Sequence, residues 1–550
     1  MFGQIVLKIW QHWPTVILLV FITYFARNRF RHGLHKYPGP LLASLTDWWR
    51  FFDVLGRRPD ITQRALHKKH GDIVRYGPNA LSFADPQALK TIYGLNKGFV
   101  KSDFYPVQQA MSKGERLPSL FSTTDEQYHA ELRRCVNSAF SMTALVQYES
   151  SIDIITEKFL DQTEAVFSSK NKICDFAEWL QYYAFDVIGE ITYSKRHGFV
   201  DRAEDVDGMV GYLGKLFNYV APVGQLPMLD LLILKNPILR FLDKHNIMSF
   251  TFPVVTFAKA RMAERLQDIE MAKVQGETPQ LMAGNGCGDL LSMFLKAKED
   301  RPEFFHDSRV LTMAVSMAFA GSETTAISLA AVFYYLLKNP QCYQNLMQEL
   351  DGSLGSGTME ARPSGITTWA ESQKLPYLDA CIKEAFRLHP AAGLIIERIV
   401  PKQGAEICGE VIPGGTIVGC NAWVIHRRAE VFGEDAEIYR PERWLEADPD
   451  VRRKMEGAMF HFGMGARTCI GKNISLLEIY KLVPSFLKRF EVCITTWPSV
   501  FSDKHAEQQM QKARLADPEK EWRLHNAWFV KQLDFNTTFK PRSRTNLPAS

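Results

Sequence analysis

Residues 307–338 have the apolar spacing of one long helix, and that helix is hydrophobic on nearly every side. Such a helix is either buried at the centre of a large fold or spans a membrane. The polar run at residues 321–325 in its middle argues against a membrane span, and Asn339 and Pro340 end it. The chain is therefore expected to fold around this helix.

The rest of the body is also predicted to be mainly helical. Apolar residues recur at three- and four-residue intervals in residues 124–140, 152–167, 175–191 and 252–275. Shorter β-like stretches lie at residues 395–400, 410–418 and 527–539. Because no repeat or linker divides the body, the sequence predicts a single large, mainly α domain with minor β-sheets.

Composition excludes several classes of protein. Lys and Arg number 65 and Asp and Glu 61, so the net charge of +4 gives no reason to expect nucleic acid as a partner. The nine cysteines form no CxxC pair, and nine is an odd number. A disulfide framework or a structural zinc site is therefore not expected, and a reducing compartment is favoured.

The N-terminus has the properties of a membrane anchor. Residues 5–26 are mostly apolar, and as a helix they reach roughly 33 Å, enough for a bilayer core. Arg27, Arg29 and Arg31 follow without a cleavage site, which keeps the body cytosolic by the positive-inside rule. We predict an anchor with a basic flank at 1–36 and one domain at 37–550. The alternatives are a cleaved signal peptide and a buried core helix.

Residues 462–471 read FGMGARTCIG and precede a segment of helical spacing. A cysteine at the mouth of a helix has its thiolate favoured by the positive end of the dipole, which applies to Cys469. The three glycines of the segment allow sharp turns and the close approach of a flat ligand. Arg467 supplies a planar donor fork that suits a carboxylate.

This segment resembles the haem-binding loop F-x-x-G-x-R-x-C-x-G of the cytochrome P450 family. The resemblance implies the P450 fold, haem b (iron protoporphyrin IX) as cofactor and Cys469 as the axial ligand of the haem iron. The residues implied to line the haem in this loop are Phe462, Gly463, Gly465, Arg467, Cys469 and Gly471.

The middle of the long helix resembles the oxygen-binding groove of the same family. Ala320, Gly321, Glu323, Thr324 and Thr325 match its motif. The resemblance implies that Thr324 relays protons and that Glu323 is an acid feeding this relay. A helical Thr commonly bonds back to the carbonyl four residues earlier, and a glycine leaves space beside it.

Glu384 and Arg387 are one helical turn apart, so both side chains project from one face. Alone, such a pair is an ordinary surface ion pair. It resembles the family's E-x-x-R motif, however, and residues 441–444, PERW, resemble its later P-E-R-F/W motif. The resemblance implies that Arg443 completes a buried cluster with the pair, supporting the loop that leads to Cys469.

The two propionates of haem need cationic or hydrogen-bonding partners. His129 and Arg133 resemble the family's W/H-x-x-x-R, and Arg398 stands where the family usually keeps an arginine. Together with Arg467 they form the implied propionate set, and Lys101 is a weaker member. The alternative for His129 is a surface or capping histidine.

The resemblance implies a monooxygenase that uses dioxygen on an apolar small molecule. No flavin or dinucleotide fingerprint is present, so the electrons of NADPH must come through the membrane-bound NADPH–cytochrome P450 reductase. A single-pass endoplasmic reticulum location is implied. The anchor and residues 101–105 look most like filamentous-fungal members of secondary metabolism, the pisatin demethylase-like group. The alternatives are a reductase-independent haem-thiolate isomerase or dehydratase and a non-catalytic, membrane-anchored haem-binding protein.

Overall fold

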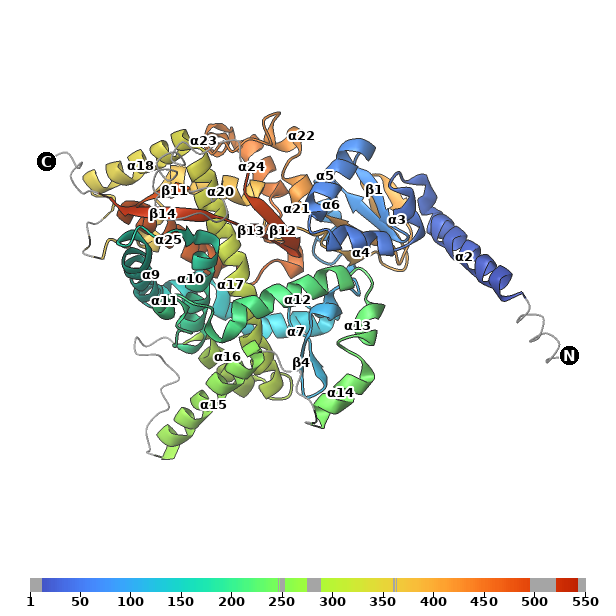
Figure 1. Ribbon diagram of the computed structural model, residues 1–550, viewed down its shortest axis with the longest axis horizontal. Helices are drawn as coiled ribbons and strands as arrows, with labels where there is room; N and C mark the ends of the chain where they lie inside the picture. Colours follow the sequence, from blue (N-terminus) through green and yellow to red (C-terminus); the bar gives the residue numbers. More distant parts are fainter. Residues whose placement is uncertain are drawn as a thin grey trace, which may run out of the picture.

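The computed structural model describes residues 12–245, 247, 253–274, 288–359, 362, 364–494 and 521–542. The body is mainly helical, with small sheets among the helices, and helix α2 (Trp13–Phe30) projects from it (Figure 1). The predicted mainly α fold with minor β-sheets is confirmed. Residues 5–11 of the predicted anchor lie outside the described residues.

Helix α17 (Asp307–Lys338) is the central element. It packs against α10 (Phe176–Tyr193), α15 (Pro253–Val274), α16 (Leu290–Asp300), α20 (Pro376–Leu388) and α25 (Lys472–Arg489). Within the described chain it is the one helix long and apolar enough to cross a membrane, but 72% of its most apolar stretch is buried inside the fold. Its apolar faces therefore meet other helices, as predicted.

Several other predicted segments match observed helices. Residues 124–140 contain α7 (Glu126–Val136), and residues 152–167 lie mostly in α9 (Glu149–Thr163). The remaining α-helices of the described chain are α3 (Leu41–Leu45), α4 (Trp48–Leu55), α5 (Pro59–His70), α6 (Gln87–Ile92), α8 (Met142–Leu145), α11 (Phe199–Arg202), α12 (Met209–Val223), α13 (Met228–Leu232), α14 (Pro237–Lys244), α18 (Pro340–Gly355), α19 (Trp369–Ser372), α21 (Ala422–Ile425), α22 (Ala429–Phe432), α23 (Glu442–Glu446) and α24 (Pro449–Ala458).

The largest sheet has five strands in the order β1 (Ile73–Gly77), β2 (Ala80–Phe83), β10 (Ile417–Cys420), β7 (Arg398–Ile399) and β3 (Val100–Lys101). Strands β2 and β10 pair in parallel and the other neighbours are antiparallel. The register of β3 and β7 sets Lys101 opposite Arg398. Two cationic residues far apart in sequence thus meet at one edge of the sheet.

The other sheets are small. Strand β14 (Asn536–Pro541) pairs with β11 (Phe490–Ile494) and β6 (Cys174–Asp175). Three hairpins complete the described strands: β4 (Ala110–Ser112) with β5 (Glu115–Leu117), β8 (Ala405–Ile407) with β9 (Glu410–Ile412), and β12 (Arg523–Ala527) with β13 (Phe529–Leu533). The three segments with a β-like pattern each contain at least one of these strands.

Candidate active site

A cavity of about 340 Å³ lies between α17 and the loop that precedes α25. Its lining is mainly apolar and includes side chains from α10, α12, α17, β13 and the segment 117–121. Ala320 is exposed although most residues of α17 are buried, because it faces this internal space. Cys469 lines the same cavity.

The loop before α25 positions Cys469. The amide of Cys469 donates to the carbonyl of Phe462 at 2.8 Å, which closes the loop. Gly463 and Gly465 have φ values of +69° and +67°, a region that favours glycine. A Cβ on Gly465 would also collide with the carbonyl oxygen of Tyr93. The loop can therefore lie this close to Tyr93 only with glycine at position 465.

Cys469 is exposed because it lines the cavity, yet protein atoms surround its sulfur closely. Burial raises the pKa of its thiol, while the backbone N–H groups of Gly471 and Lys472 and the charge of Arg133 act in the opposite direction. A thiolate in this place needs a further positive charge, which a metal ion would supply.

Helix α7 places two side chains beside the cavity, one turn apart. The carboxylate of Asp125 caps the helix by accepting from the Tyr128 amide at 2.9 Å. His129 and Arg133 then both face the cavity. A guanidinium nitrogen of Arg133, Nη1, donates to the carbonyl of Thr468 at 2.8 Å and so ties the helix to the residue before Cys469.

Positive charge gathers on one side of the cavity. We call Lys101, His129, Arg133, Arg398 and Arg467 the basic cluster; all five line the cavity. Burial and the charges of Arg398 and Arg467 hold the pKa of Lys101 well below its ordinary value. Burial and the cations around it lower the pKa of His129 to about 3, so its ring is neutral at pH 7.

The basic cluster has too few anions of its own. Within the described chain, Lys101, Arg133 and Arg398 have no carboxylate within ion-pair distance. Arg398 donates instead to the Tyr105 hydroxyl at 3.2 Å and to the Glu397 carbonyl at 2.8 Å. A bound anion would relieve the repulsion that lowers the pKa of Lys101.

Arg467 makes a contact that the sequence does not predict. Its guanidinium forks onto Glu126, with distances of 2.7 and 3.1 Å between nitrogen and carboxylate oxygen, and Nη1 donates to the Leu120 carbonyl at 3.1 Å. The planar fork does hold a carboxylate, as expected, but one from the protein itself. Arg467 therefore connects the start of α7 to the Cys469 loop.

On α17, Thr324 and Glu323 face different surroundings. Thr324 lines the cavity, and its hydroxyl donates to the Ala320 carbonyl at 2.7 Å. Glu323 is buried outside the cavity lining, where it accepts from the amide of Gln181 and lies 3.7 Å from the Lys531 ammonium. The structure thus brings Thr324, but not Glu323, to the cavity.

Gly321 also has a packing role. A Cβ at this position would come within 2.8 Å of Cγ1 of Ile188 on α10. Because the glycine lacks that atom, α10 and α17 can lie in close contact beside the cavity. Gly321 itself also lines the cavity.

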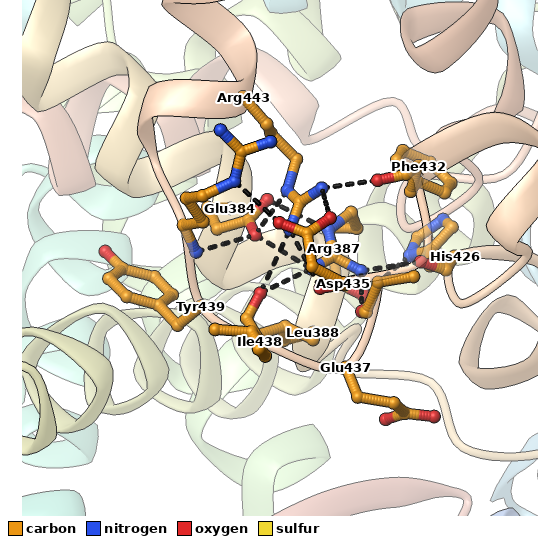
Figure 2. Close-up of polar contacts among 12 residues, drawn as sticks. Glu384, Arg387, Leu388, His426, Phe432, Asp435, Glu437, Ile438, Tyr439 and Arg443 are labelled. Carbon is orange, nitrogen blue, oxygen red and sulfur yellow. Dashed lines mark hydrogen bonds and ion pairs between the residues drawn. The ribbon is translucent and has the colours of Figure 1, made fainter.

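Glu384, Arg387 and Arg443 form a cluster that is shielded from solvent (Figure 2). Arg387 donates twice to the Glu384 carboxylate, at 2.9 and 2.8 Å, and Arg443 donates to it at 2.9 Å. The indole of Trp444 adds a fourth bond to that carboxylate at 2.9 Å. Burial alone would raise the pKa of Glu384, but the hydrogen bonds and charges of the two arginines outweigh burial and lower it.

The same arginines hold the loop between α21 and α23. Arg387 donates to the carbonyls of His426, Ala436 and Ile438, at 2.8, 2.5 and 3.1 Å. Arg443 donates to the Phe432 carbonyl and to the Asp435 carboxylate. Figure 2 shows these groups converging on one side of Glu384. The predicted contact among the three residues is therefore present, and it organises the segment between α21 and α23, in which α22 is the one short helix.

Comparison of the sequence with known proteins identifies the family of this chain. The sequence profile described as Cytochrome P450 matches residues 43–530. The chain belongs to the cytochrome P450 family. Cytochrome P450 monooxygenase cicH of Emericella nidulans is 39% identical over 526 residues, which cover 96% of this chain and 97% of the relative.

Two further relatives have similar coverage. A cytochrome P450 monooxygenase of Aspergillus terreus is 39% identical over 481 residues, covering 87% of this chain and 95% of the relative. Cytochrome P450 monooxygenase asR2 of Sarocladium schorii is 34% identical over 534 residues, covering 96% and 97%. The resemblance to fungal members of the family is confirmed, and the chain is a cytochrome P450 monooxygenase.

The residues present fit the haem that the cytochrome P450 family implies. Cys469 offers one sulfur to the cavity, and glycines 463 and 465 keep side chains out of the loop beside it. The basic cluster has more positive charge than its own carboxylates neutralise, which suits the two propionates of haem. The remaining lining is mainly apolar. Sequence motifs indicated Lys101 weakly and did not indicate Glu126. The register of β3 with β7 sets Lys101 opposite Arg398, and Arg467 pairs with Glu126 at the start of α7.

Proposed function

We propose that this cytochrome P450 uses dioxygen and two electrons from NADPH, delivered by NADPH–cytochrome P450 reductase, to oxidise an apolar small molecule. The observation that carries the proposal is one cavity with Cys469 and the basic cluster on one side and Thr324 of α17 on another. A CO difference spectrum of the reduced protein, followed by a test for NADPH- and reductase-dependent product, would examine it. Turnover without NADPH would favour the isomerase or dehydratase alternative.

Cys469 is proposed to bind the haem iron as thiolate. Lys101, Arg133 and Arg398 would bind the propionates, while Arg467 would hold the loop through Glu126. When bound, thiolate-ligated haem supplies the activation of dioxygen. The apolar lining excludes water and binds the substrate body.

Thr324 is proposed to hold and pass on a proton at Oγ1. Its hydroxyl now donates to Ala320, and rotation away from that carbonyl would turn the proton toward the cavity. Glu323 is held by Gln181 and Lys531, so proton supply from Glu323 requires its side chain to leave these partners. Thr324 is therefore the residue on which the relay depends.

Replacing Thr324 with alanine is expected to uncouple turnover. NADPH consumption continues, but product per NADPH falls by roughly tenfold and released hydrogen peroxide rises, because the proton donor at the cavity is lost. Ser322→Ala is the matched control, since Ser322 donates back along the same helix but lies outside the cavity lining. Unchanged coupling in Thr324→Ala would contradict the relay.

The substrate is proposed to belong to fungal secondary metabolism. This proposal is supported by the fungal origin of the relatives and by the apolar side chains that the cavity presents. Met313, Met317 and Phe319 from α17 and Phe217 from α12 form much of that surface. A screen of metabolites from such pathways, in which binding is followed by the shift of the ferric Soret band of the holoenzyme, would test it.

Helix α2 is proposed to anchor the protein in the endoplasmic reticulum membrane with the body in the cytosol. Residues from Val16 to Ile22 are exposed apolar side chains, and α2 ends in a basic stretch. Near its end Asn28 donates to the Leu45 carbonyl at 2.7 Å, and Arg75 bonds the carbonyls of Asn28 and Arg29. The helix therefore has a defined junction with the body while its apolar part is free of it.

Deletion of residues 1–26 is expected to release the protein from membranes. This deletion removes the apolar part but keeps the contacts of Asn28 and Arg29 with the body. Full-length protein should stay in the pellet after alkaline carbonate extraction, whereas the shortened protein should move to the supernatant with its CO spectrum intact. Retention of the shortened protein in the carbonate-washed pellet would contradict the anchor.

A further inference from the structure

A second pocket, of about 570 Å³, adjoins the cavity of the active site. Leu117 of β5 and Thr312 of α17 line both spaces, so the two spaces meet at these residues. The second pocket is built from the hairpin of β4 and β5, the end of α14 and the first turns of α17. The hairpin lies beside α14, where Gly114 receives a hydrogen bond from Arg240 at 3.0 Å (Figure 1).

The charges of this second pocket are unbalanced. Its permanent cations are Lys113, Arg116, Lys244 and Arg309, and we call it the basic pocket. One carboxylate, Glu115, lines it, and that residue is exposed on the hairpin. Across the residues that the structure describes, none of the four cations has a carboxylate within ion-pair distance.

Arg116 and Arg309 are half-buried, whereas Lys113 and Lys244 of the basic pocket are exposed. Nε of Arg116 is buried without a hydrogen-bond acceptor among the described residues, and the charge of Lys235 lies close enough to interact with it. The Arg309 guanidinium lies 3.8 Å from the ring centre of Phe304 and 5.0 Å from that of Tyr128. Nη1 of Arg309 donates to the Phe304 carbonyl, whereas Nε of Arg116 lacks an acceptor that a bound anion would supply.

We propose that the basic pocket binds a carboxylate of the substrate, so that the substrate is an apolar acid whose hydrocarbon body passes Leu117 and Thr312 into the cavity. This inference rests on the proposed function and narrows its substrate class. Arginine pairs with carboxylate through two parallel hydrogen bonds, which fixes orientation as well as affinity. The acid group is then held away from Cys469, and a carbon of the apolar body is presented for oxidation.

The test compares matched ligands on the holoenzyme. Octanoate, decanoate and dodecanoate are titrated against the corresponding alcohols at constant ionic strength, by equilibrium dialysis and by the shift of the ferric Soret band. We expect each acid to bind at least about tenfold more tightly than its alcohol. The variant carrying Arg116→Gln and Arg309→Gln should lose this preference while binding the alcohols unchanged.

Arg453→Gln serves as the control, because it removes one positive charge from an exposed position on α24. It should keep the preference for acids. Equal binding of acids and alcohols across the series, or a preference that survives the double substitution, overturns the inference. A protein without the thiolate CO spectrum contradicts the proposed function instead. A normal spectrum without acid preference contradicts this inference alone.

Discussion

Replacing Cys469 with serine is expected to abolish the red-shifted Soret band of the reduced CO complex and to lower product formation by more than about 10³-fold. A serine hydroxyl stays protonated where the thiolate would bind the iron, so the electron donation that favours O–O cleavage is lost. The structure supports this expectation because Cys469 is the cysteine among the cavity-lining residues of the described chain. The CO difference spectrum and single-turnover product yield measure it.

Cys135→Ser is the matched control for this substitution. Cys135 is partly exposed on α7 but is not part of the cavity lining. Its variant should keep the thiolate spectrum and the product yield. An unaltered spectrum in Cys469→Ser would remove the basis of the proposed function.

Replacing Glu384 with alanine is expected to yield apoprotein or insoluble protein. The substitution leaves the charges of Arg387 and Arg443 buried without their shared carboxylate, which costs about 3–5 kcal/mol of folding free energy. It also frees the loop that both arginines hold through backbone carbonyls. The haem-to-protein ratio and the soluble fraction measure the effect.

The control for Glu384 is Glu446→Ala, which removes a carboxylate from an exposed pair with Arg440. Exposed pairs contribute little, so this variant should fold and bind haem normally. Normal haem content in Glu384→Ala would contradict the structural role. Because the folded-state pKa of Glu384 is lowered, its contribution to stability is present above the unfolded carboxyl pKa and is lost as pH falls through the lowered value.

Motifs in the sequence were sufficient for the residues whose roles depend on local spacing. Gly463, Gly465, Cys469 and Gly471 lie in one turn-rich loop, and Glu384 and Arg387 share a helix face. The central helix was also predictable, because a segment that is apolar on every side has few other places to fold. In each case the signal is local: a short motif, a spacing of one helical turn or the apolar pattern of a single segment.

Other assignments depended on which way neighbouring side chains point. Glu323 and Thr324 are consecutive in a motif, but successive side chains of a helix point in different directions. Thr324 therefore faces the cavity, while Glu323 packs against α10 and β13 outside it. Arg467 meets Glu126, a residue more than three hundred positions earlier. No local pattern encodes such a pairing.

The amino-acid sequence by itself indicated the family, the iron-binding cysteine expected at 469, the Glu–Arg–Arg cluster and the buried central helix, because each is marked by a motif that resembles the family's or by one hydrophobic pattern. Only the tertiary structure decided that Lys101 joins Arg398, that Arg467 pairs with α7, and that a basic pocket shares a wall with the cavity. These features arise where strands, helices and hairpins from distant parts of the chain pack together, and strand register and helix rotation are settled by that packing.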